Sequence, residues 1–177
     1  MGIVKWMILV IVAIVGFNYY QKQTTEWREV VSDQGAFSVS MPGRPTLELQ
    51  KEVTVLGQVD IPHYVVEQNG LGYMAGYADF PTTARRTGSD SEVLDGASSG
   101  VVKGARGTLL SESRIRYGHH PGRELRIEAT RDNRKYTVHL RVYLAGNRIY
   151  QLGVFVPEGA EATDATRFLG SFKLLGE

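Results

Sequence analysis

The sequence contains no cysteine among its 177 residues. Disulfide bonds and thiolate metal sites are therefore excluded, and so is a bacterial lipid anchor, which is built on a cysteine. The absence is compatible with an oxidising compartment but does not require one. Whatever structure this chain adopts is held together without disulfide bonds.

A recognisable catalytic constellation and the common nucleotide-binding patterns are also lacking. The chain has no Gly-x-x-x-x-Gly-Lys phosphate loop and no Gly-x-Gly-x-x-Gly dinucleotide motif. Ser98 and Ser99 fall in a segment expected to be helical, where they form helix surface rather than an activated nucleophile with its base. The sequence therefore predicts neither an enzyme nor a cofactor.

A strong net charge is absent as well, since the whole chain carries a formal charge of +1. Residues 27–177 hold 18 basic and 18 acidic side chains, which gives little general attraction to nucleic acid. The distribution is uneven, because residues 114–148 hold nine basic and three acidic residues. This surplus indicates either a basic face for an acidic partner or anionic lipid, or solvated arginines on strand exteriors.

One long apolar run is present, at residues 6–17, with Lys5 before it. Counted from residue 2 to 20, it reaches the length of about 20 residues that spans a membrane. The basic N-terminal side favours a cytoplasmic N-terminus. We expect residues 1–22 to form a single-pass anchor that places the rest of the chain on the extracytoplasmic, periplasmic side. A cleaved signal peptide is the alternative, although bulky aromatic residues stand where cleavage needs small ones.

Residues 23–26 are expected to form a polar linker and residues 27–177 one domain, which is long enough for a proper core. The first part of this domain alternates apolar and polar residues, as strands do. Asn69-Gly70 separates two such runs. It predicts a tight hairpin, because a type I′ turn needs positive φ at both central residues.

A helical pattern follows Pro81. Ser89 and Glu92 fit a capping box with Ser89 at the N-cap. An apolar stripe at helical spacing comes next, made of Val93, Leu94, Ala97, Val101 and Ala105. The stripe is narrow and rich in small residues, so we expect this helix to lie close on a sheet.

The remainder, from residue 108, again has the pattern of strands. Residues 149–156 are the most continuously apolar and are predicted to lie at the sheet centre, with both faces covered. Residues 160–170 are expected to form a closing helix, and residues 171–175 to finish the domain. Hairpin connections dominate, which predicts the α+β class with a mainly antiparallel sheet flanked by helices.

Several segments resemble a known family. Residues 35–43, Gly-Ala-Phe-Ser-Val-Ser-Met-Pro-Gly, are similar to the opening of many bacterial exported domains, and residues 121–124, 143–152 and 168–172 fit the same pattern. Together they resemble the PsbP-like fold, which includes the extrinsic lumenal proteins of photosystem II and a nuclear-transport factor that binds the GTPase Ran. The resemblance implies a central antiparallel sheet flanked by helices and a non-catalytic binding role, but no particular functional residue.

Basic and aromatic residues on the outer face of the second strand series form the candidate partner-binding surface: Arg126, His139, Arg141, Tyr143 and Arg148, with Arg123 at a neighbouring corner. Arg123 could instead make a structural ion pair. The pair His119-His120 would need further ligands, such as His63, Asp60 or Glu67, to hold a metal. Two exposed turn histidines are the simpler interpretation, and no metal site is predicted.

These observations predict a membrane-anchored, extracytoplasmic binding or scaffold module for a cell-envelope protein. The alternative is a domain that binds a small molecule or an envelope polymer.

Overall fold

The computed structural model describes residues 26–54, 57–79, 89–162 and 164–176. The anchor predicted at residues 1–22 lies outside these ranges, as does most of the predicted linker. Among the helices of the described residues, none has both the length and the apolar character needed to cross a membrane.

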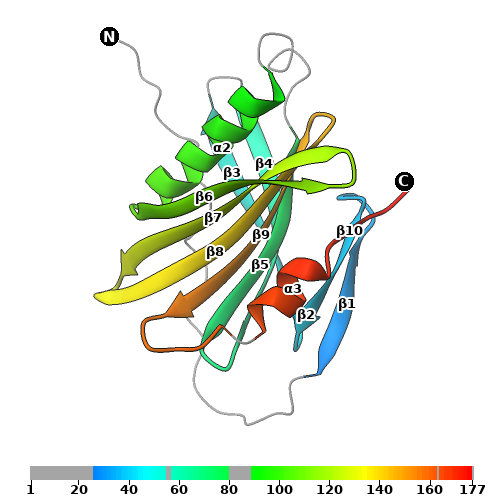
Figure 1. Ribbon diagram of the computed structural model, residues 1–177. Coiled ribbons are helices and arrows are strands. Elements are labelled where there is room, and N and C mark those ends of the chain that lie inside the picture. The colour runs from blue at the N-terminus through cyan, green and yellow to red at the C-terminus, as the bar shows by residue number, and fades with distance from the viewer. Residues whose placement is uncertain (1–25, 55–56, 80–88, 163, 177) are drawn as a thin grey trace, which may run out of the picture.

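The described residues form two antiparallel sheets and two helices (Figure 1). Every strand pairing is antiparallel, which confirms the predicted α+β class. The larger sheet has the strand order β3-β4-β5-β9-β8-β7-β6, with β3 (Thr46–Thr54), β4 (Gly57–Gln68), β5 (Leu71–Asp79), β6 (Thr108–Tyr117), β7 (His120–Arg131), β8 (Arg134–Ala145) and β9 (Arg148–Pro157). The smaller sheet has the order β1-β2-β10, with β1 (Trp27–Ser32), β2 (Phe37–Pro42) and β10 (Lys173–Leu174). The helices are α2 (Asp90–Gly104) and α3 (Ala165–Gly170).

Two tight turns fix the register of the larger sheet, and the sequence predicted the first of them. Asn69 and Gly70 have φ values of 53° and 79°, so the expected hairpin between β4 and β5 is confirmed. Asp132 and Asn133 adopt the same conformation between β7 and β8, with φ of 48° and 59°. Asparagine and aspartate tolerate this left-handed region better than other residues with a side chain.

One side of the larger sheet is covered by α2 (Figure 1). The capping box is present, since the Ser89 hydroxyl accepts from the Glu92 backbone N–H and the Glu92 carboxylate accepts from the Ser89 N–H. The buried side of the helix includes Leu94, Ala97 and Val101, which confirms most of the predicted stripe. They pack on alternate residues of β7 and β8, including Leu125, Ile127, Leu140 and Val142.

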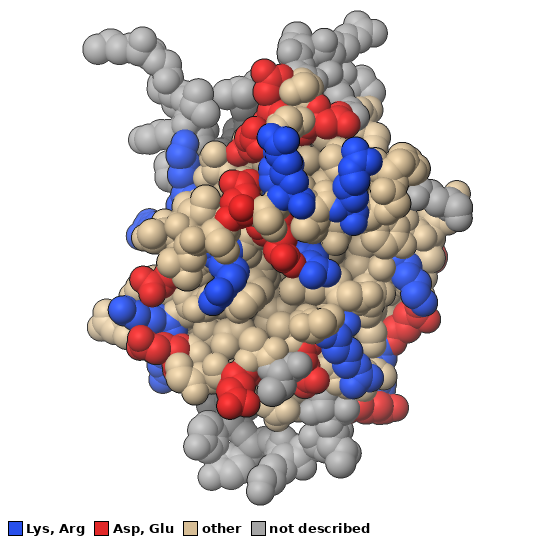
Figure 2. All heavy atoms as spheres, viewed as in Figure 1, with Lys and Arg blue, Asp and Glu red and all other residues tan. Residues whose placement is uncertain are grey.

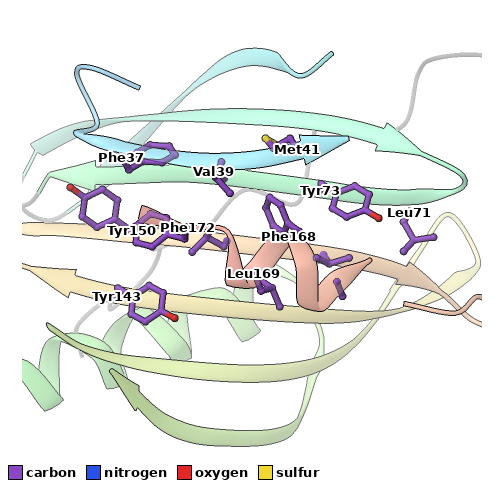
Figure 3. Packing of buried hydrophobic residues seen from close by; sticks show 14 of the residues in the cluster. Phe37, Val39, Met41, Leu71, Tyr73, Tyr143, Tyr150, Phe168, Leu169 and Phe172 are labelled. Carbon is purple, nitrogen blue, oxygen red and sulfur yellow. The ribbon is translucent and has the colours of Figure 1, made fainter. Parts of the chain in front are cut away.

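The other side of the larger sheet is covered by the smaller sheet and α3 (Figure 3). Phe37 of β2 lies at the centre of an aromatic cluster, with Tyr64, Tyr77, Tyr150 and Phe172 at ring-centroid distances of 5.9–6.3 Å. The sequence predicted strands at β1 and β2, but it did not indicate that they form a separate sheet.

The C-terminal helix is shorter than predicted, since among the described residues the helix expected at 160–170 is confined to Ala165–Gly170. Within the last predicted segment, 171–175, Lys173 and Leu174 form a short strand, which was not predicted. β9 is the fourth of seven strands, so its central position is confirmed.

Candidate binding surface

Part of the larger sheet is left open on the side that faces α3. The strand register places the side chains of Ser111, Ser113, Arg126, Glu128, Thr137 and His139 on this side of β6, β7 and β8. We call these six residues the open face. Four of them are exposed and the two from β8 are half-buried. The smaller sheet, α3 and the C-terminal segment cover the strands β4, β5 and β9. Beyond these strands they contact Arg141 and Tyr143 on β8 and Tyr117 at the end of β6, and the open face begins past these three residues.

Arg126 lies near the middle of the open face. It is opposite His139 on β8 and opposite Ser111 on β6. Arg126 is exposed and forms no ion pair with any described residue. Burial lowers the pKa of His139, and the positive charge of Arg126 lowers it further, against an opposing effect of Glu124. His139 is therefore neutral at pH 7 and can donate or accept a hydrogen bond beside a free guanidinium.

Arg141 is on the same side of β8, but its guanidinium is already occupied. Its Nε donates to Glu124 Oε1 at 2.7 Å, and its Nη1 donates to the Leu169 carbonyl of α3 at 3.3 Å. Arg141 therefore connects the sheet to α3 and marks the border of the open face.

Neither Tyr143 nor Arg148 is available on the open face, because Tyr143 is buried and the half-buried Arg148 is already paired. Tyr143 is buried, and its ring is nearly parallel to that of Phe172, at 5.6 Å. Arg148 donates to both carboxylate oxygens of Asp79, at 2.6 and 2.7 Å, and to the Gln34 carbonyl at 2.9 Å. The structure thus brings only Arg126 and His139 of the predicted set together on an open surface.

Arg123 lies on the opposite side of the sheet, facing α2, and its side chain is 6% exposed. It donates to Asp95 Oδ1 at 2.6 Å and to Ser91 Oγ at 2.9 Å, and its Nε is 3.4 Å from Glu112 Oε1. These contacts hold α2 against β6 and β7. Its observed role matches the structural ion pair that the sequence left as one of two interpretations.

The serines of α2 include a Gly-x-Ser-x-Gly pattern at residues 96–100. In hydrolases such a serine sits in a sharp strand-to-helix turn. Here the whole pattern lies inside α2, and the Ser98 hydroxyl donates to Glu112 Oε1 at 2.9 Å. The geometry is that of a helix packed on a sheet.

The histidines do not assemble into a metal site. The rings of His119 and His120 are adjacent at the β6–β7 turn, tilted by 41° with centroids 3.9 Å apart, whereas His63 lies on β4, near the other edge of the sheet. Among the described residues no group of three or more histidines and carboxylates is arranged to hold a metal. His120 is buried, so only His119 fits the interpretation of exposed turn histidines.

A buried polar row crosses the sheet on the α2 side and was not predicted. His63, Gly76 and Gln151 are directly opposite one another on β4, β5 and β9. The His63 ring occupies the space above Gly76, where a Cβ atom would come within 2.5 Å of His63 Cδ2. Neither ring nitrogen of His63 nor Oε1 of Gln151 has a hydrogen-bond partner among the described residues.

This burial makes the stability of the domain depend on pH. Burial lowers the pKa of His63 to about 4, and the backbone at Ile61 offsets the effect only in part. The unfolded state therefore binds more protons between pH 6.5 and 4, and stability is lost as the pH falls through this range. We expect His63 to lower the free energy of unfolding by about 2 kcal/mol between pH 7 and pH 5.

The measurement is urea unfolding at both pH values for the wild type and for His63→Leu. The variant should lose most of the pH dependence, whatever its absolute stability. His139→Gln is the control, because His139 is less buried and should account for little of the difference. An unchanged pH dependence in His63→Leu would contradict the attribution of this pH dependence to His63.

Comparisons with known proteins agree with this architecture, which is that of an antiparallel sheet covered on one side by a helix and on the other by a small sheet. The chain has a PsbP-like fold. It superposes on the solution structure of cyanobacterial PsbP from Synechocystis with a TM-score of 0.57, over 89% of this chain and 98% of that one, at 10% sequence identity.

Two further structures are less similar. A crystal structure from Bacteroides thetaiotaomicron gives a TM-score of 0.48 at 14% identity, over 84% of this chain and 48% of that one. A Pseudomonas aeruginosa protein of unknown function, described as a putative regulator, gives 0.37 at 9% identity, over 80% and 90%. No protein-family model matches the sequence, and no curated protein matches it.

Proposed function

We propose that this chain is a membrane-anchored, extracytoplasmic binding module without catalytic activity, and that its open face binds an acidic segment of a cell-envelope protein. The observation that carries the proposal is Arg126. It is the one arginine of the predicted set that is exposed and without an ion pair among the described residues.

The surroundings of Arg126 suit a polar, extended ligand. Hydroxyl groups of Ser111 and Ser113 lie on one flank, and the neutral imidazole of His139 lies on the other. Glu128 shares the face, so the surface is not uniformly basic. Lys and Arg side chains also alternate with Asp and Glu across the surface seen in Figure 2. This pattern favours a ligand positioned by individual contacts over one held by a general electrostatic field.

The test begins with purification of the tagged full-length protein from crosslinked native membranes. The same N-terminal residues fused to an unrelated domain show which proteins follow the anchor alone. A partner specific to residues 27–177 is then titrated against the wild type and against Arg126→Glu.

We expect Arg126→Glu to weaken binding at least tenfold, because a charged hydrogen bond worth about 1.5–3 kcal/mol is replaced by repulsion. Arg134→Glu is the matched control, because it makes the same charge change at an exposed position on the opposite side of β8. Equal losses in both variants would contradict a specific role for the open face. Arg141 is unsuitable for this test, since its reversal would break its bond to Glu124.

The alternative, a small-molecule binding domain, is favoured by a different observation. The buried atoms of His63 and Gln151 that have no hydrogen-bond partner in the described part of the chain are groups that a ligand with both a donor and an acceptor would satisfy. If no specific protein partner is found, a stability screen with small molecules on the purified chain tests this function.

A further inference from the structure

Among the described strands, β6 ends the larger sheet and its outer edge is unpaired. It pairs with β7 alone among the described strands, and seven of its ten residues are exposed in succession. A long free edge offers backbone donors and acceptors to another strand, and natural proteins usually cover or interrupt such edges. Here a bulge between Leu109 and Ser111 interrupts only the first part of the strand.

The sequence of the regular part of β6 is complementary to itself. In antiparallel pairing, residues that lie opposite one another share a face of the sheet. If two copies pair about a two-fold axis at Ser113, Glu112 of each copy lies opposite Arg114 of the other, and Ser111 lies opposite Ile115. Two such pairs then form, each between the carboxylate of one copy and the guanidinium of the other, and both lie on the α2 side. Pairs of opposite charge on adjacent strands stabilise a sheet.

From this pattern we propose that two copies of the chain associate through β6, edge to edge and antiparallel about Ser113, to form one continuous sheet. The arrangement is isologous and closes at two copies. It also extends a network that already exists, because Glu112 contacts Arg123 and Ser98 within its own chain.

The strand at the opposite edge of the larger sheet, β3, does not have a self-complementary sequence. On β3, Glu48 and Lys51 are an odd number of residues apart, so their side chains are on opposite faces. No antiparallel pairing of β3 with itself can place these two charges opposite each other. The self-complementary pattern is therefore a feature of β6 and not of strand edges in this chain generally.

Association through β6 would place two open faces side by side. The axis at Ser113 is perpendicular to the sheet, so both open faces point to the same side. Ser111 and Ser113 of each copy would border the joint surface. The pairing itself does not use Arg126, and it goes beyond the proposed function by giving the protein two binding surfaces in one plane.

The absence of cysteine allows a direct test in the full-length chain in its membrane. Paired residues on the axis have Cα atoms about 4.5–5.5 Å apart, which is within the range for a disulfide. We expect Ser113→Cys to give at least tenfold more oxidised dimer than Ser111→Cys. Ser111 is on the same strand and is also exposed, but its two copies would be separated by about 13 Å.

Arg114→Glu in the Ser113→Cys background supplies the second test. The new carboxylate of one copy lies opposite Glu112 of the other, so we expect crosslinking to fall at least fivefold.

Three outcomes would overturn the proposal: equal crosslinking of Ser113→Cys and Ser111→Cys, little crosslinking of either variant, or no effect of Arg114→Glu. Arg126→Glu should leave crosslinking unchanged, which separates failure of this proposal from failure of partner binding. Thermal unfolding of each variant confirms that it is folded.

Discussion

Replacement of Phe37 by alanine is expected to lower the free energy of unfolding by about 3–5 kcal/mol. The Phe37 side chain is 1% exposed and contacts aromatic rings from β4, β5, β9 and the C-terminal segment. Its removal leaves a cavity between the two sheets that rigid ring neighbours cannot easily fill. A loss of this size is a large part of the total stability of a typical domain.

Urea unfolding of the full-length protein measures the effect. Val31→Ala is the control, because Val31 belongs to the same small sheet but is 51% exposed. It should change stability by about 0.5 kcal/mol or less. A loss below about 1 kcal/mol in Phe37→Ala would show that the smaller sheet contributes little to the core.

The second large effect is expected at the contact between α2 and the sheet. The double substitution Asp95→Asn and Glu112→Gln leaves the buried charge of Arg123 without either carboxylate. We expect a loss of about 3–5 kcal/mol, the usual cost of removing the partners of a buried charge.

Arg123→Met provides the informative comparison for that network. It removes the buried charge itself, while Asp95, whose side chain is 59% exposed, returns to water. Replacement of a buried ion pair by apolar groups is often neutral or stabilising. We therefore expect Arg123→Met to be more stable than the double variant in the same urea experiment. The reverse order would mean that the hydrogen bonds of Arg123 outweigh the cost of burying its charge.

Local sequence signals predicted the local structure well. The capping box at Ser89, the Asn69-Gly70 turn and the central position of β9 all depend on neighbouring residues or on composition, and all three are confirmed. The face of β7 on which Arg123 lies could also be predicted, because side chains alternate between the two faces of a strand and Arg123 shares its face with Leu125 and Ile127.

The extent of the open face could not be predicted in the same way. His139, Arg141 and Tyr143 alternate along one side of β8 and look equivalent in the sequence. Tyr143 is buried by Phe172, Arg141 binds α3, and His139 remains at the border of solvent. These differences arise from elements that are distant in the chain. The same holds for Arg148, whose partner Asp79 is 69 residues away.

The last strand of the chain, β10, pairs with β2 near the start of the domain, and the Leu175 N–H donates to the Ala36 carbonyl at 2.8 Å. Phe172, which fills the aromatic cluster, follows Phe37 by 135 residues. When the chain is synthesised from its N-terminus, the apolar surface of Phe37 and its neighbours therefore stays exposed until residue 172 has been added. Completion of the core is thus a late kinetic event, and during synthesis the exposed aromatic residues are available to chaperones or to wrong partners.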